Sequence, residues 1–367
     1  MALALAAAGC GSAPVAPAAG RQSLSVGFLD DSAGKSSPLE KNGAELAVAE
    51  YNMHADSTYH AVLVPVTTNG TPADAAQGAA KLAKTERLVG VVGRLNDADS
   101  SSAASVLQQA GMPFLTTSAG SASSAAAGSF RRLVATNLQQ GRTLGRYATR
   151  LLAPAGPAFV FHDDSPEAND FSQGVKAAFD AAKRPVGRFE RIGPKTDLMG
   201  LAGSFAPSPP VVLVFAGEGG LGARFAEASR KAGFKGPIVS SSGILSGKPT
   251  GAPDGLVTEL PVADPAESTA AGFRARYHTK FGAKPPPLAL ESYEGVSMLL
   301  EAAEEVEPKP KDIAGFFALN RSFLGDSKDY EYDETGEIRS SVIWIYQTKA
   351  GGWTLVGRWP GSARRKP

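Results

Sequence analysis

The chain of 367 residues contains one cysteine, Cys10, and four histidines. A single cysteine excludes a disulfide bond within the chain. His162, Asp163, Asp164 and Glu167 lie close together and have the chemistry of metal ligands, but the histidines do not recur at the spacing of a zinc site. We therefore interpret these four as solvated residues of a loop after a strand, and we predict no bound metal.

The chain also has almost no excess of charge of either sign and few long apolar runs. Lys and Arg number 37 and Asp and Glu number 36, so the formal net charge is +1. No basic run is longer than Arg364–Lys366, so no nucleic-acid partner is predicted. After Cys10 no apolar stretch reaches the roughly 20 residues that span a bilayer, so any link to a membrane would be through a lipid.

Complete catalytic motifs are missing as well. The Gly-x-Ser-x-Gly elbow of hydrolases does not occur. Gly217–Gly222 has the G-x-G-x-x-G pattern of a dinucleotide-binding loop, but the next predicted strand ends at Ser240–Ser242 without the acidic residue that would bind a ribose. We interpret Gly217–Gly222 as a tight strand-to-helix turn that lines a cleft. The sequence predicts a protein that is not an enzyme and uses no cofactor.

The periodicity of the chain predicts an α/β fold. Short β-branched runs alternate with segments of helical period from Ser23 to Thr116, and the same alternation restarts after Asn137. The last residues, Ser341–Trp359, form two alternating runs joined by Ala-Gly-Gly, which predicts a hairpin. We expect two doubly wound parallel-sheet lobes, with a ligand cleft between the carboxyl ends of their strands.

The N-terminal segment has a distinct composition. An apolar run ends in Gly9-Cys10 and is followed by a Gly-, Ser-, Ala- and Pro-rich stretch as far as Gly20. This arrangement resembles the end of a bacterial lipoprotein signal, which implies that Cys10 is lipidated and that the protein is anchored outside the cytoplasm. No basic residue precedes Arg21, a feature we interpret as a start site placed too late. The alternative is an Ala-rich tail with an accidental cysteine.

Six segments of the chain have the order and spacing of segments in one known family. They are Asn42–Asn52, Leu88–Gly93, Met112–Ser118, Gln140–Gly141, Glu291–Val296 and Tyr332–Gly336. Together they resemble the leucine/isoleucine/valine-binding family of type I periplasmic binding proteins, which serve ABC importers. The resemblance covers nearly the whole chain after the N-terminal segment. It implies a two-lobed clamp with three crossings, near Thr136–Leu138, Leu260–Pro261 and Leu324–Gly325.

This resemblance also implies a division of the chain and a function. Residues 1–22 would be a signal remnant and linker, residues 23–136 with 262–323 the first lobe, and residues 137–261 with 324–367 the second. The protein would be an extracytoplasmic solute-binding protein that clamps a small polar solute, such as an amino acid or amide, and delivers it to an ABC permease. An extracellular sensor of the same fold is the alternative, and an enzyme is a third.

Matching positions imply a set of ligand-binding residues from both lobes. They are Ser36, Asn96, Asp97, Thr116, Thr117 and Ser118 in the first lobe, Asn137 at a hinge, and Glu167, Glu218 and Ser242 in the second lobe. Ser36, Glu167 and Glu218 stand where the family often has an aromatic residue, and they cannot supply the apolar contact area of a ring. We therefore expect a ligand that is more polar or more cationic than leucine, with Glu167 and Glu218 facing it. The alternative is that both acids are exposed on a rim.

Overall fold

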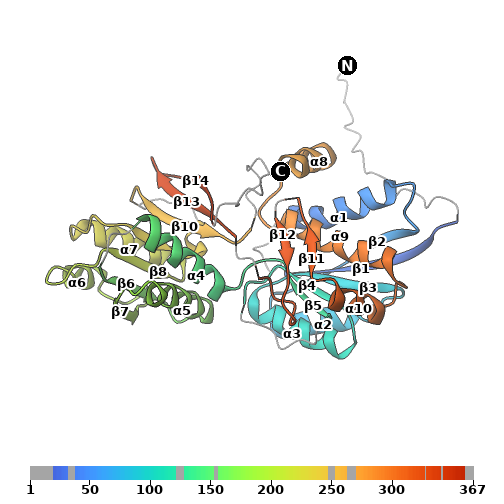
Figure 1. Ribbon diagram of the computed structural model, residues 1–367, viewed down its shortest axis with the longest axis horizontal. Coiled ribbons are helices and arrows are strands. Elements are labelled where there is room, and N and C mark those ends of the chain that lie inside the picture. The colour runs from blue at the N-terminus through green and yellow to red at the C-terminus, as the bar shows by residue number, and fades with distance from the viewer. Residues whose placement is uncertain are drawn as a thin grey trace, which may run out of the picture.

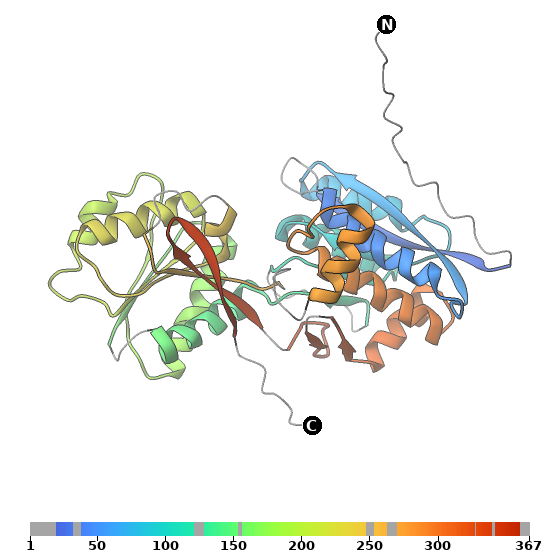
Figure 2. The same cartoon turned by 90° about the horizontal axis from the view of Figure 1, so that it is seen from above.

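The computed structural model describes residues 20–31, 38–120, 128–152, 156–246, 253–262, 270–326, 328–339 and 342–359. These residues form two α/β lobes that lie side by side (Figures 1 and 2). Cys10 and Ser36, two residues with a predicted role, lie outside the described residues. Within the described ranges, no helix is long and apolar enough to cross a membrane.

The first lobe is built on a five-stranded parallel sheet with the order β2-β1-β3-β4-β5. Its strands are β1 (Gln22–Asp31), β2 (Tyr59–Thr68), β3 (Leu88–Arg94), β4 (Phe114–Thr116) and β5 (Phe130–Arg132). Its helices are α1 (Pro38–Met53), α2 (Pro72–Leu82), α3 (Asp97–Gln109), α8 (Ala271–Phe281), α9 (Ala289–Glu305) and α10 (Pro310–Leu319). The strand order reverses between β1 and β3, which is the switch point where ligands bind in open α/β sheets.

Both faces of this sheet are covered by helices. One face packs against α1, α9 and α10 through residues such as Ala44, Leu299 and Phe317, and the other packs against α2 and α3 through residues such as Leu82 and Leu107. A parallel strand that is buried on both faces needs a continuous apolar run. The six buried residues of Leu88–Gly93 are such a run, because β3 lies in the middle of the sheet.

The second lobe is built on a seven-stranded sheet with the order β14-β13-β10-β9-β8-β6-β7. Its strands are β6 (Ala158–His162), β7 (Val186–Arg191), β8 (Val212–Ala216), β9 (Ile238–Ser240), β10 (Leu256–Leu260), β13 (Ile343–Lys349) and β14 (Gly352–Trp359). Its helical elements are α4 (Asn137–Tyr147), α5 (Pro166–Ala181), α6 (Leu198–Gly203), α7 (Gly219–Lys231), the π-helical turn η1 (Ala148–Leu152) and the 3₁₀ turn η2 (Ser242–Ser246). The strands β13 and β14 form the antiparallel hairpin predicted at the end of the chain.

The third crossing between the lobes lies later in the chain than the expected Leu324–Gly325. Strands β11 (Ser322–Leu324) and β12 (Asp329–Glu331) pair with each other. Tyr330 and the following Tyr332 and Ile338 are buried in the core of the first lobe. The chain therefore returns to the second lobe only between Arg339 and Ile343, and the predicted assignment of residues 324–339 to the second lobe is corrected. The physical reason is the burial of two tyrosines from a hairpin too short to show a clear period.

Close packing between α4 and α5 gives a testable prediction about Gly174. A Cβ atom at Gly174 would overlap the backbone oxygen of Leu138, and one at Gly141 would overlap that of Phe171. We expect Gly174→Ala to lower the free energy of unfolding by about 3 kcal/mol, because overpacking a tight contact forces the backbone apart. Urea unfolding measures this change.

The matched control for Gly174→Ala is Gly315→Ala in α10, where a Cβ atom meets nothing within 4 Å. Alanine is the better helix former, so we expect this control to be neutral or stabilising by up to about 1 kcal/mol. Equal effects of the two substitutions would show that the α4–α5 contact tolerates separation, contrary to the packing argument.

Candidate functional site

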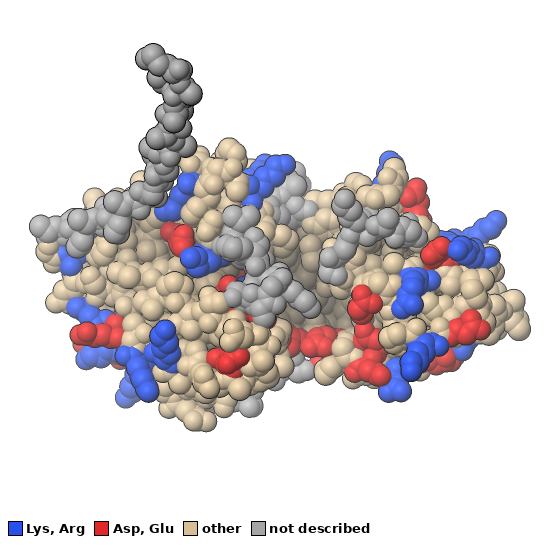
Figure 3. Space-filling model, turned by 180° about the vertical axis from the view of Figure 1, so that it is seen from behind, with Lys and Arg blue, Asp and Glu red and all other residues tan. Residues whose placement is uncertain are grey.

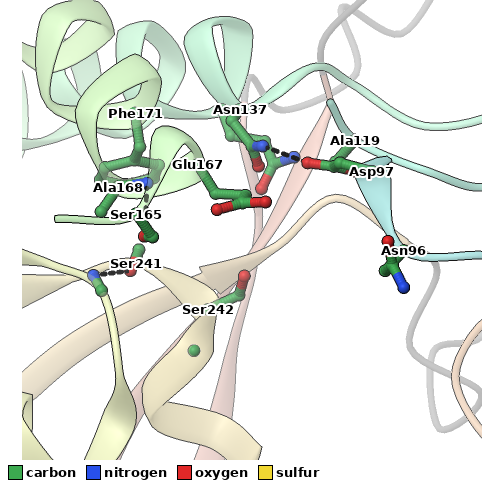
Figure 4. Close-up of a pocket in the computed structure, with 13 residues that line it drawn as sticks. Asn96, Asp97, Ala119, Asn137, Ser165, Glu167, Ala168, Phe171, Ser241 and Ser242 are labelled. Carbon is green, nitrogen blue, oxygen red and sulfur yellow. Dashed lines mark hydrogen bonds between the residues drawn. The ribbon is translucent and has the colours of Figure 1, made fainter. Parts of the chain in front are cut away.

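A cavity of about 360 Å³ opens between the two lobes. Side chains from both lobes and from the hinge helix α4 surround it (Figure 4). Its lining consists of Asn96, Asp97, Ala119, Asn137, Gln140, Ser165, Glu167, Ala168, Phe171, Gly217, Ser241, Ser242 and Gly243. Seen from behind, the molecule is hollowed between the lobes, and acidic side chains gather beside the hollow (Figure 3).

The lining residues follow the carboxyl ends of parallel strands. Asn96 and Asp97 follow β3 in the first lobe, next to the switch point between β1 and β3. In the second lobe Ser165 and Glu167 follow β6 and Gly217 follows β8, and these two strands flank the switch point of that sheet. Two sheets that face each other with these edges form a cleft, which explains why residues far apart in sequence share one cavity.

Asp97 forms a hydrogen bond that connects the two lobes. Its Oδ2 accepts a hydrogen bond from Asn137 Nδ2 at 2.9 Å, and Asn137 begins α4 of the second lobe. Its Oδ1 accepts a hydrogen bond from Ser118 Oγ at 2.5 Å. The carboxylate of Asp97 is therefore oriented by one donor from each lobe, and it keeps further lone pairs for a ligand.

Thr116, Thr117 and Ser118 do not line the cavity, but the two threonines shape the loop that carries Ser118. Thr116 is fully buried, its Oγ1 accepts a hydrogen bond from Ser118 N at 3.1 Å, and it lies 2.9 Å from Ser100 Oγ. Thr117 N donates to the backbone oxygen of Gly93 at 3.0 Å. These contacts hold Ser118 beside Asp97, so the predicted threonines position the wall rather than form it.

Glu218 directs its carboxylate to its own helix. Its two oxygens accept hydrogen bonds from Gly220 N at 2.6 Å and from Leu221 N at 2.7 Å, which caps the N-terminus of α7. Glu218 follows the lining residue Gly217 in the chain, but Glu218 itself does not line the cavity. Glu167 and Ser242, the other two predicted residues of the second lobe, are in the lining.

Asp163 joins the two loops of the second wall. Its Oδ1 accepts a hydrogen bond from Ser165 Oγ at 2.7 Å, and its Oδ2 accepts one from Glu218 N at 2.7 Å. A Cβ atom at Gly217, where φ is 135°, would overlap this carboxylate. Asp163 was predicted to be a solvated loop residue, whereas the structure shows it as the acceptor that holds the starts of α5 and α7 together. Across the described ranges, no three His, Cys, Asp or Glu side chains converge as metal ligands would.

Several lining residues carry no signal that identified them in the sequence. They are Ala119, Gln140, Ser165, Ala168, Phe171, Ser241 and Gly243, whereas Gly217 belongs to the turn interpreted above as lining a cleft. A helical spacing could have found two of them, because Phe171 lies one turn after Glu167 on α5 and Gln140 lies one turn after Asn137 on α4. Of the others, Ala168 is in the first turn of α5 and Gly243 is in the 3₁₀ turn η2. Ala119, Ser165 and Ser241 lie in loops or at a helix cap, where no local pattern specifies which residues face the cavity.

Comparison with known proteins identifies the family. Residues 23–320 match the family described as periplasmic binding protein. The chain belongs to this family. No curated protein sequence is similar enough to the chain to count as a match. As a periplasmic binding protein the chain is a solute-binding protein that acts outside the cytoplasm, and the predicted resemblance and fold class are confirmed.

Solved structures with this fold include proteins with different ligands. An ABC transporter substrate-binding protein from Desulfitobacterium hafniense has a TM-score of 0.78 at 18% identity over 91% of this chain and 100% of that chain. A leucine binding protein from Thermotoga maritima has a TM-score of 0.72 at 20% identity over 91% and 98%. A solute binding protein from R. palustris, in complex with benzoate, has a TM-score of 0.67 at 18% identity over 92% and 96%. At these identities the likeness shows the fold alone.

A buried acid lies behind the cavity wall of this periplasmic binding protein. Glu259 of β10 is fully buried, opposite Ile345 of β13 and on the same strand as the core residue Val257. Burial raises the pKa of Glu259 to about 8, and the backbone of the wall residue Ser242 opposes this shift. Neither carboxyl oxygen makes a well-formed hydrogen bond to a described residue. Glu259 is therefore held in its neutral form at neutral pH.

Proposed function

We propose that this periplasmic binding protein is the solute receptor of an ABC importer and that it clamps a small polar solute in the cavity between its lobes. The single observation that carries the proposal is the cavity itself, which is lined by residues of both lobes and has a volume of about 360 Å³. Pockets for small solutes have volumes of roughly 300–1,000 Å³. A solute that contacts both walls binds the closed form more tightly than an open form, and so it favours closure.

The polar lining supports a polar solute. Asn96, Asn137 and Ser242 supply amide and hydroxyl groups, and Phe171 is the one aromatic side chain among the lining residues of the described ranges. A few hydrogen bonds to charged groups inside a closed cleft suffice for a Kd of about 1 μM, which corresponds to about −8.2 kcal/mol. An amino acid or amide, as the family resemblance implies, and an amine all fit this description.

The partners of the protein are part of the same proposal. The closed, loaded form would dock on an ABC permease, and lipidated Cys10 would tether the receptor to the membrane near that permease. Two lipid chains hold a protein firmly at a bilayer, whereas one holds it only marginally. Co-purification of a permease would support import, and co-purification of a signalling kinase would support a sensor instead.

The experiment is a thermal-unfolding screen of the purified protein against amino acids, amides, amines and sugars. A solute that binds only the folded state raises the free energy of unfolding by about 2.7 kcal/mol at a hundredfold excess over Kd. We expect one polar class to stabilise the protein and sugars to leave it unchanged. No stabilisation by any solute at millimolar concentration would contradict the proposed function.

A further inference from the structure

The charged side chains that line the described part of the cavity are all acidic. Asp97 on the first lobe and Glu167 on the second are its charged side chains, and within the described ranges it contains no Lys, Arg or His. Glu167 makes no hydrogen bond or ion pair to a described residue, and Figure 4 shows its carboxylate extending from the start of α5 into the cavity. Closing the lobes takes both carboxylates out of water, which is costly unless a positive group pairs with them.

Several of the backbone N–H groups that could bind an anion on the second lobe already have acceptors within the protein. Helix N-termini are natural sites for carboxylates and phosphates, because several backbone N–H groups point outward there. At α7 these groups donate to the carboxylate of Glu218, at 2.6 Å and 2.7 Å. At α5 the Ser165 side chain accepts from Ala168 N. A ligand carboxylate that bound these N–H groups would have to displace the protein's own acceptors at both helices.

Backbone N–H groups of the loop behind the first-lobe wall also have acceptors. Thr117 N donates to the Gly93 backbone oxygen at 3.0 Å, and Ser118 N donates to Thr116 Oγ1 at 3.1 Å. The N-termini of α3 and α4 are capped by Asn96 and Thr136. The described part of the cavity thus has two carboxylates to receive a positive charge, while several of the backbone N–H groups around it already have acceptors within the protein.

We propose that this cavity selects a small organic cation without a carboxylate group, that is, a primary amine or diamine whose ammonium pairs with Asp97 and Glu167. The inference rests on the proposed function of the same cavity. Because the two acids belong to different lobes, an ammonium that pairs with both acts as a link between the lobes. Charge-assisted hydrogen bonds are roughly twice as strong as neutral ones, so this link is the main source of affinity.

The test compares each amino acid with the amine that differs from it only by loss of the carboxylate. The pairs are lysine and cadaverine, arginine and agmatine, and leucine and 3-methylbutylamine, titrated by calorimetry into the full-length protein. We expect at least one amine to bind ten or more times more tightly than its parent amino acid, and its affinity to fall as sodium chloride is raised.

A second arm uses Glu167→Gln, which keeps the shape of the side chain and removes its charge. We expect it to weaken amine binding by at least tenfold, while the midpoint of thermal unfolding stays the same because Glu167 is exposed. The matched control is Asp180→Asn on the same helix, an exposed residue paired with Lys176 outside the cavity, which should bind the amine like wild type.

The outcomes separate this inference from the proposed function. An amino acid that binds as tightly as its amine, or more tightly, overturns the inference and leaves the solute receptor intact. Unchanged amine affinity in Glu167→Gln also overturns it. Binding of no amine, amino acid or amide overturns both.

Discussion

Glu337→Ala is expected to lower the free energy of unfolding by about 3–5 kcal/mol, because it leaves a buried guanidinium without its partner. Arg132 donates from Nε to Glu337 Oε2 at 2.6 Å and from its second terminal nitrogen to Glu337 Oε1 at 3.0 Å. The two residues are 3% and 6% exposed. Urea unfolding of the variant at neutral pH measures the loss.

The same substitution should also disturb the position of Asp97 in the cavity. Arg132 also donates to the backbone oxygen of Ser118, and the Ser118 hydroxyl orients Asp97. The control is Glu334→Ala, which removes an exposed ion pair with Arg321 at 3.5 Å and should change stability by less than about 1 kcal/mol. If Glu337→Ala costs no more than this control, Arg132 is not held by the ion pair and the argument fails.

Glu259→Gln is expected to make the protein more stable than wild type at pH 8 and to have little effect at pH 5. Burial raises the folded-state pKa from 4.5 to about 8, so the folded state keeps a proton that the unfolded state loses. For a group with a raised folded-state pKa, stability falls as pH rises from the unfolded value to the folded one. Each pH unit between the two pKa values lowers the free energy of unfolding by about 1.4 kcal/mol, which amounts to about 4 kcal/mol between pH 5 and pH 8.

Urea unfolding of wild type and variant across pH 5 to 8 tests this second prediction. Glutamine has the shape of the protonated acid and does not titrate, so the variant should lack the downward slope. Glu227→Gln, a surface residue paired with Lys231, is the control and should keep the wild-type slope. Parallel curves for wild type and Glu259→Gln would show that Glu259 ionises without cost, contrary to its burial.

The fold could be predicted from the sequence because its signals are local. The apolar run of Leu88–Gly93 is explained by burial on both faces of a parallel sheet, and the Ala-Gly-Gly turn leads into the β13–β14 hairpin. The third crossing could not be predicted in the same way. Its position depends on Tyr330 and Tyr332, which are buried against the first lobe, where Tyr330 donates to Glu294. Such a partner is far away in sequence and leaves no local pattern.

The candidate site was also predictable only where its signals are local. Asn96, Asp97, Asn137, Glu167 and Ser242 were predicted and line the cavity. A residue just after a parallel strand lies at the carboxyl edge of the sheet whatever the rest of the fold does, so its place is a local property. The direction of its side chain depends on which of several hydrogen-bond partners it contacts, and the sequence does not show which one. Glu218 is the example, because its carboxylate accepts hydrogen bonds from the first N–H groups of α7 and does not face the cavity.

The sequence by itself determined the order of strands and helices, and it determined which polar side chains follow the strands of each lobe. Only the tertiary structure decided which of them share one cavity. Asp97 and Asn137 are 40 positions apart, and their hydrogen bond exists because the crossings bring the edges of two sheets face to face. The bond between them depends on the relative placement of the lobes, which arises from many distant contacts, including the burial of Trp344 of the second lobe against helices of the first.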